Sequence, residues 1–320
     1  MTGAGPTAPG GLGAPGLVRR LEATIRAYGA GWALVAFSGG VDSSVVLALA
    51  VRALGPQAVT AVTAVSPSYP SGELEGARRT ARALGVRHRV VATGEVEREA
   101  YARNDAWRCF HCKVELYGTL RRLAAEAAGR GAALLAGANA DDRADFRPGL
   151  LAAGRFGVRN PLLEAGVGKQ AVRALARHLG LSVADKPALA CLSSRVAFGL
   201  RITPELLARI DRAEALVRAL GFGQVRVRHF GDRATVEVEE PERLAAHPRW
   251  PEARAALRAL GWRAVELDPG GYRPGRMNET LGDGTAAGAG RASAGPLPLM
   301  GAPRTAGGSG SGPPGSPPGS

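Results

Sequence analysis

The sequence predicts an α/β protein, with a doubly wound parallel sheet followed by a smaller C-terminal α+β unit. Strand-like apolar segments alternate with helix-like segments over the first 187 residues, and a turn rich in serine and glycine joins the first of these strands to a helix. After Lys186 and Pro187 the pattern changes, because a helix is followed there by two short alternating strands. Strict alternation of strands and helices favours a parallel sheet covered on both faces, with ligands at the carboxyl ends of its strands.

Hydrophobic periodicity defines the individual elements. The strands predicted for the main sheet cover residues 33–37, 59–65, 87–91 and 133–136. The helices predicted between them cover residues 43–54, 74–84, 114–127 and 169–179. Two of these helices end in Leu-Gly, and glycine commonly ends a helix because it adopts the left-handed conformation easily. The C-terminal unit is predicted to contain helices at 204–220 and 252–260 and strands at 225–229, 234–238 and 264–267.

Composition divides the chain of 320 residues into four predicted segments. We expect a disordered tail at 1–16, a nucleotide-binding domain at 17–187, a substrate-binding domain at 188–280 and a disordered tail at 281–320. The tails consist mainly of small residues and proline, so burial cannot offset the entropy lost on ordering them. No apolar run reaches membrane-spanning length, and no basic segment followed by a hydrophobic one opens the chain. We therefore expect a cytoplasmic protein without membrane contact.

The chain is strongly basic, with a formal net charge of +13. Its arginines are spread along helices, as at Arg78, Arg79 and Arg82, and do not form one block. This distribution favours a solvated surface and an anionic substrate over nucleic acid, which we do not expect as a partner. The three cysteines are too few for a disulfide framework, so we interpret them as chemical groups.

The most informative segment is 38–43, Ser-Gly-Gly-Val-Asp-Ser, which lies between an apolar strand and an apolar helix. Its glycines let the backbone approach an anion, and free N–H groups at the helix start point toward that anion. Asp42 would repel a bare phosphate, but it suits phosphates that carry Mg²⁺. No Gly-Lys-Ser/Thr follows the glycines, so this is not a Walker A loop. The segment predicts a metal-bound nucleotide.

Two segments contain the cysteines. Residues 108–113 hold Cys109 and Cys112 at the spacing used for metal or cluster binding. Residues 186–195 set Cys191 beside hydroxyls and a guanidinium that can bind phosphate.

Two further segments collect charged residues. Residues 137–149 follow a predicted strand and combine three acids with two arginines, although a polar turn would have the same composition. Arg226 and Arg228 alternate along a predicted strand and therefore share one of its faces.

The strand-SGGVDS-helix pattern resembles the PP-loop ATP pyrophosphatases, and seven motifs in order resemble the LarE family within that superfamily. These motifs are SGGVDS, RCFHCK, GANADDRADFRPG, VGKQAVRALARHLGL, KPALACLSSR, RVRHFGD and GYRPGRMNETL, and they extend from about residue 17 to 280. The resemblance implies a PP-loop domain at 17–187 and a sulfur-transfer and substrate-binding domain at 188–280. It implies an ATP-dependent sulfur transferase that adenylylates pyridinium-3,5-biscarboxylic acid mononucleotide and forms thiocarboxylates for the nickel-pincer cofactor of lactate racemase.

The resemblance also implies site residues. ATP is expected to contact Ser38, Gly39, Gly40, Val41, Asp42, Ser43, Gly137 and Asn139, with Mg²⁺ on Asp42. Catalytic roles are expected for Cys191, Asp42 and Glu214. The anionic mononucleotide is expected to contact Trp107, Ser194, Arg195, Arg226 and Arg228. Packing would explain Trp107, and a solvated helix face Glu214, equally well. Phe230 departs from the family pattern, in which we expect a second histidine after His229.

Cys191 occupies the position of the family's sulfur-transfer cysteine, which in many members gives up its own sulfur and becomes dehydroalanine. Cys109 and Cys112 need another explanation, because a sacrificial enzyme needs only one sulfur donor. Some relatives hold an iron-sulfur cluster with three cysteines, so we predict a 4Fe-4S cluster on Cys109, Cys112 and Cys191. Zinc with His111 as a fourth ligand, or unliganded cysteines, remain as alternatives.

Two rival functions share the nucleotide loop. A PP-loop tRNA thiolase would also form an adenylate, but the ACLSSR and GYRPGRMNE segments follow the LarE pattern. A non-catalytic nucleotide-binding regulator would not need the intact Asp42 and Ser43. We further expect a homo-oligomer and a separate sulfur-donor protein as partners.

Overall fold

The computed structural model describes residues 12–126, 131–143, 148–187 and 190–273. In this part of the chain the main sheet has four parallel strands in the order β3-β2-β1-β4. Their bounds are β1 Trp32–Ala36, β2 Val59–Val65, β3 Arg87–Ala92 and β4 Ala132–Leu135. The predicted parallel sheet is confirmed, and each predicted strand agrees with the observed one to within one residue at either end.

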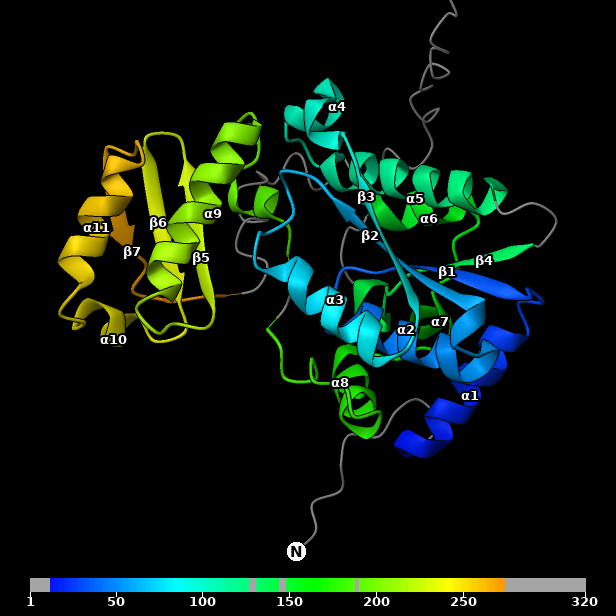
Figure 1. Ribbon diagram of the computed structural model, residues 1–320. Coiled ribbons are helices and arrows are strands. Elements are labelled where there is room, and N and C mark those ends of the chain that lie inside the picture. The colour runs from blue at the N-terminus through cyan, green and yellow to red at the C-terminus, as the bar shows by residue number, and fades with distance from the viewer. Residues whose placement is uncertain (1–11, 127–130, 144–147, 188–189, 274–320) are drawn as a thin grey trace, which may run out of the picture.

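Helices cover both faces of this sheet (Figure 1). One face packs on α1 Ala14–Arg26, α2 Val41–Leu54, α3 Glu73–Ala83 and α8 Lys169–His178. The other packs on α5 Arg108–Glu126 and α6 Pro148–Phe156. Side chains alternate along β1, where Ala33 and Val35 join the first core and Leu34 joins the second. The doubly wound arrangement is therefore confirmed.

A second, three-stranded sheet follows in the order β5-β6-β7, beside the first in Figure 1. Its strands are β5 Val225–Phe230, β6 Arg233–Val238 and β7 Ala264–Leu267, with β5 antiparallel and β7 parallel to β6. It packs on α9 Pro204–Arg218 and α11 Trp250–Ala259. Thr203 caps α9, accepting a hydrogen bond from the Leu206 amide at 3.2 Å. The predicted α+β unit is confirmed, and the domain boundaries stay a prediction.

Several helices differ from the sequence prediction. α1 begins at Ala14, inside the segment expected to be a tail, and buries Leu17, Leu21 and Ile25. α5 begins at Arg108, so the RCFHCK motif forms its first turns. The short helices α4 Glu99–Ala102, α7 Pro161–Glu164 and α10 Pro241–Ala245 were not predicted. Residues 1–11 and 274–320, which include the predicted C-terminal tail, lie outside the described residues.

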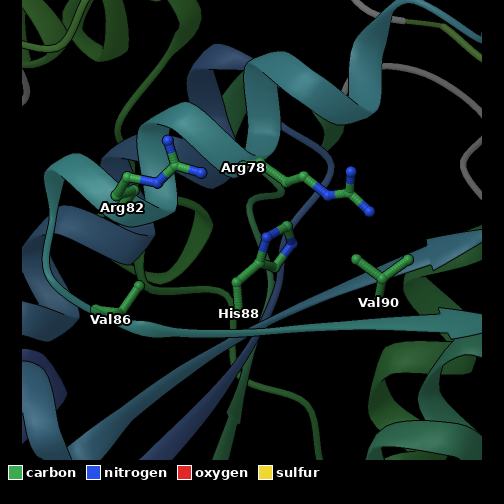
Figure 2. A pocket seen from close by; sticks show the side chains of 5 residues that line it. All are labelled: Arg78, Arg82, Val86, His88 and Val90. Atoms are coloured by element: carbon green, nitrogen blue, oxygen red, sulfur yellow. The ribbon is translucent and has the colours of Figure 1, made fainter.

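His88 lies on β3 and points toward α3, where a pocket opens at the edge of the sheet (Figure 2). The residues that line this pocket are Arg78, Arg82, Val86, His88 and Val90. The His88 Nε2 atom lies 2.8 Å from the Thr63 hydroxyl. Burial, and then the charge of Arg78, lower the pKa of His88. Burial also lowers the pKa of His229, and Arg209 acts in the same direction.

We expect the free energy of unfolding to decrease as the pH falls below about 6.5. Unfolding returns His88 and His229 to their ordinary pKa, so the unfolded chain binds more protons in this range and is favoured. Each histidine can contribute at most about 1.4 kcal/mol per pH unit. Urea unfolding at pH 7.5 and at pH 5.5 measures the difference, and His88→Gln should reduce it. Equal stability at the two pH values would contradict the expectation.

Candidate active site

The 38–43 loop leaves the carboxyl end of β1 and enters α2, whose first turn contains Asp42. Gly39 has φ +76°, and a Cβ there would lie 3.0 Å from the Ala77 Cβ, so both conformation and space require glycine. The loop's hydroxyls order its own backbone. The Ser43 hydroxyl donates to the Gly40 carbonyl at 3.1 Å and lies 3.2 Å from the Ser38 hydroxyl. The loop is thus a preformed turn at a helix start, as an anion site requires.

Gly137 follows β4 and lies against this turn. A Cβ at Gly137 would be 2.8 Å from the Ser43 amide nitrogen, a distance that no real Cβ contact tolerates. Two residues on, the Asn139 side-chain Nδ2 donates to Asp42 Oδ1 at 3.0 Å. β1 and β4 are adjacent where the strand order reverses, which is where ligands bind in doubly wound sheets. The structure therefore brings the predicted nucleotide residues of both loops together.

Two lysines that were not predicted as site residues also reach the loop. Lys169, the first residue of α8, forms an ion pair with the Asp42 carboxylate. Lys186 donates to the Gly39 carbonyl at 3.3 Å and forms an ion pair with Glu73. Both ammonium groups therefore lie at the predicted nucleotide loop.

Asp42 has the type of side chain that binds Mg²⁺ when the ion is also bound by phosphates. Its side chain is 22% exposed and provides hard carboxylate oxygens. Mg²⁺ usually takes one or two carboxylates together with substrate phosphates and water. A single carboxylate at the predicted nucleotide loop would therefore be a sufficient protein ligand.

Residues 190–195, which we name the Cys191 segment, lie at the same carboxyl end of the sheet's strands. The Leu192 amide donates to the Ser68 carbonyl at 2.8 Å, just beyond the end of β2. Next to Ser68, the Tyr69 hydroxyl donates to the Ser38 carbonyl in the nucleotide loop at 3.0 Å. Cys191 therefore belongs to a segment that is two hydrogen bonds from the nucleotide loop.

A buried ion pair holds this segment against the C-terminal unit. Arg195 Nε and Nη2 donate to the two Glu214 oxygens at 2.8 and 3.1 Å, and Arg195 is 2% and Glu214 0% exposed. Arg195 Nη1 also donates to the carbonyls of Ala190 and Cys191 at 2.7 and 2.9 Å. The interpretation of Glu214 as part of a solvated helix face is wrong, because its carboxylate neutralises a buried guanidinium.

The two strand arginines differ in their surroundings. Arg228 forms an ion pair with Glu237 at 2.8 Å and donates to the Ser194 carbonyl at 3.1 Å. Arg226 lies 5.4 Å from the Tyr272 ring centroid. Burial, and then the neighbouring Arg195 charge, lower the pKa of Arg226 to about 10. Arg195 and Arg228, both expected at the substrate phosphate, are thus engaged with carboxylates, which sequence alone did not indicate.

Residues of α4 and of the start of α5 contact the Cys191 segment as well. Arg108 is buried and donates to the Ser193 carbonyl at 3.0 Å and to the Asn104 side chain at 2.5 Å. The Tyr101 hydroxyl donates to the Ser193 hydroxyl at 2.7 Å. Trp107, which precedes Arg108, packs edge-to-face on Phe110 with ring centroids 5.9 Å apart. A role for Trp107 at the substrate stays a prediction.

The three thiols are neighbours, but they do not form a metal site in this structure. Burial, and then the charges of Glu95, Cys191 and Cys109, raise the pKa of Cys112 to about 12, against the effect of Lys113. Cys109 is exposed. Among the described residues, no three His, Cys, Asp or Glu side chains are grouped closely enough to hold a metal ion. The iron-sulfur cluster is therefore not supported by this geometry, and it stays a prediction.

Comparisons with known proteins agree with this site. The family asparagine synthase matches residues 31–128, from β1 through α5. An uncharacterized protein from Synechocystis sp. is 42% identical over 251 residues, covering 78% of this chain and 92% of the relative. An NH₃-dependent NAD⁺ synthetase from Hyperthermus butylicus is 31% identical over 225 residues, covering 64% of this chain and 75% of that enzyme.

A further relative carries a specific name. The pyridinium-3,5-bisthiocarboxylic acid mononucleotide synthase from Lactiplantibacillus plantarum is 38% identical over 252 residues, covering 77% of this chain and 89% of that enzyme. Within the described residues, no helix has the length and apolar character that crossing a bilayer requires. The 38% identity to the Lactiplantibacillus plantarum enzyme over most of both chains confirms the predicted resemblance. The chain belongs to the LarE family of pyridinium-3,5-bisthiocarboxylic acid mononucleotide synthases.

Proposed function

We propose that this chain uses ATP to adenylylate the carboxylates of pyridinium-3,5-biscarboxylic acid mononucleotide and converts them to thiocarboxylates for the nickel-pincer cofactor of lactate racemase. The observation that supports this most directly is that two segments meet at the carboxyl ends of β1 and β2. The nucleotide loop follows β1, and the Cys191 segment is hydrogen-bonded to Ser68, just beyond the end of β2. Activation and sulfur transfer act on one carbon atom, so they need such proximity.

Activation comes first because a carboxylate has no adequate leaving group. Attack of a carboxylate oxygen on the ATP α-phosphate forms a C–O–P linkage and releases pyrophosphate. The N-terminus of α2, with Lys169 and Lys186, would stabilise the charge that accumulates on the phosphates. Mg²⁺ on Asp42 would neutralise further phosphate charge when it is bound.

In the next step, sulfur replaces AMP on the acyl carbon. The Cys191 sulfur attacks the acyl carbon, a C–S bond forms, the C–O bond to AMP breaks, and the thiol proton is lost to solvent. In the sacrificial form of the reaction, loss of the Cys191 α-proton and cleavage of its Cβ–S bond release the thiocarboxylate and leave dehydroalanine. Each chain would then complete a single sulfur transfer.

The anionic substrate would lie between the Cys191 segment and β5. Its phosphate would be recognised by Arg226, with Arg228 and Arg195 holding the surrounding backbone through their contacts to Ser194 and Cys191. We also propose that the protein forms a homo-oligomer and receives sulfur from a separate donor protein.

Replacement of Cys191 tests whether this residue acts in sulfur transfer and not in adenylylation. Cys191→Ala should retain AMP formation that depends on the mononucleotide, and it should lose thiocarboxylate formation. Cys109→Ala and Cys112→Ala are the matched controls and should retain a first turnover in the sacrificial route. Thiocarboxylate formation by Cys191→Ala would contradict the assignment.

Mass spectrometry after turnover identifies the sulfur source. Loss of about 34 Da from Cys191, the mass of H₂S, marks dehydroalanine and the sacrificial route. An unchanged Cys191, together with iron and sulfide in anaerobically purified protein, would instead support the predicted cluster.

A further inference from the structure

Glu95 is a buried carboxylate with no cationic partner among the described residues. It follows β3, is 3% exposed, and is absent from every ion pair formed by residues 12–126, 131–143, 148–187 and 190–273. Its Oε1 atom accepts hydrogen bonds from the hydroxyls of Ser66 and Ser68 at 2.5 and 3.0 Å. A buried carboxylate that is balanced by hydroxyls alone adds little to stability. Its position therefore calls for another explanation.

Those two serines form a turn just beyond the end of β2. Their hydroxyl oxygens lie 2.9 Å apart, and the Ser66 hydroxyl accepts from the Ser68 amide at 3.1 Å. The Ser66 carbonyl accepts from the Tyr69 amide at 3.0 Å. Glu95 thus fixes a compact turn at residues 66–69, which we name the bridging turn.

The bridging turn contacts both halves of the proposed site. Through the Ser68 carbonyl it holds the Leu192 amide at 2.8 Å, next to Cys191. Through the Tyr69 hydroxyl it holds the Ser38 carbonyl at 3.0 Å, inside the nucleotide loop. Any shift of this turn therefore changes the separation between the activated carbon and the attacking sulfur.

Sulfur transfer is sensitive to that separation. Reacting atoms must be held about 3 to 3.5 Å apart, and a displacement near 1 Å can lower a rate by about a hundredfold. An acyl-adenylate that waits for a misplaced sulfur is exposed to attack by water. Misplacement should then appear as AMP formed without thiocarboxylate.

We propose that Glu95 is a positioning residue for sulfur transfer, which it supports by holding the bridging turn between the nucleotide loop and the Cys191 segment. This inference rests on the proposed function. It requires a hydrogen-bond acceptor at Glu95 and does not require its charge.

The test measures AMP and thiocarboxylate in the same reaction with ATP, Mg²⁺ and the mononucleotide. Glu95→Ala should keep AMP formation within about twofold of the wild type, and its yield of thiocarboxylate per AMP should fall about tenfold or more. Glu95→Gln should restore that yield, because its amide oxygen accepts from both serines. Glu97→Ala, two residues along and exposed, is the matched control and should leave the yield unchanged.

Three results would overturn the inference: an unchanged yield in Glu95→Ala, an equal fall of AMP and thiocarboxylate, or a Gln variant as impaired as the Ala variant. If Glu95→Ala does not fold by circular dichroism, Ser68→Ala, which removes one hydroxyl and keeps the carbonyl, should show the same lowered yield, and a normal yield there would overturn the inference. Absence of AMP formation by the wild type would instead overturn the proposed function, and this inference with it.

Discussion

Asp42→Asn should lower mononucleotide-dependent pyrophosphate release by about 10²-fold or more. Asparagine preserves the shape of the side chain and can still accept from Asn139, but it cannot neutralise Lys169 or hold Mg²⁺ against the phosphates. The effect should therefore appear in the rate of activation, with the fold intact. Pyrophosphate release measured over a range of Mg²⁺ concentrations reports it directly.

Glu252→Asn is a suitable control for this substitution, because it removes an exposed carboxylate from the far helix α11. It should leave pyrophosphate release unchanged. An Asp42→Asn enzyme with wild-type activity would show that the carboxylate neither holds metal nor orders the loop.

Arg195→Ala should lower the free energy of unfolding by about 3–5 kcal/mol, because it leaves the Glu214 carboxylate in the interior without its main counter-charge. Glu214 is 0% exposed and would retain Arg218, at 2.6 Å, as its remaining cationic partner among the described residues. The variant also loses the contacts to the Ala190 and Cys191 carbonyls. Urea unfolding measures the loss.

The exposed pair of Arg243 and Glu240 provides the matched control. Arg243→Ala should change stability by no more than about 1 kcal/mol, as surface pairs do. Replacing both buried partners, Arg195→Met with Glu214→Leu, should recover part of the stability lost in the single variant. Unchanged stability in Arg195→Ala, together with weaker mononucleotide binding, would instead show that Arg195 binds the substrate phosphate.

Sequence alone predicted the sheet well, because β1, β2 and β4 are short, mostly apolar runs that can be recognised without tertiary information. It missed α1, although Leu17, Leu21 and Ile25 repeat at helical spacing, since the Gly and Pro content before them suggested a tail. It also began α5 too late. The cysteine-containing motif 108–113 was predicted to bind a metal or cluster and was not assigned to a helix, whereas its residues form the first turns of α5.

Sequence motifs predicted the segments of the site, but they did not indicate which of their side chains meet. Lys169 and Lys186 lie more than a hundred residues from the loop that they contact, so only the fold brings them to Asp42 and Gly39. The pairing of Arg228 with Glu237 was accessible in principle, because the β5–β6 hairpin register puts Glu237 opposite Arg226, one diagonal step from Arg228. No motif pointed to Glu95, and the role that we propose for it rests on its hydrogen bonds to Ser66 and Ser68.

Product analysis of one reaction tests the central claim most directly. The protein is incubated with ATP, Mg²⁺ and pyridinium-3,5-biscarboxylic acid mononucleotide, and nucleotides and pyridinium products are separated. We predict AMP, pyrophosphate and a thiocarboxylate, with AMP formed only when the mononucleotide is present. ADP and phosphate as the main products, or AMP formation that ignores the mononucleotide, would contradict the account.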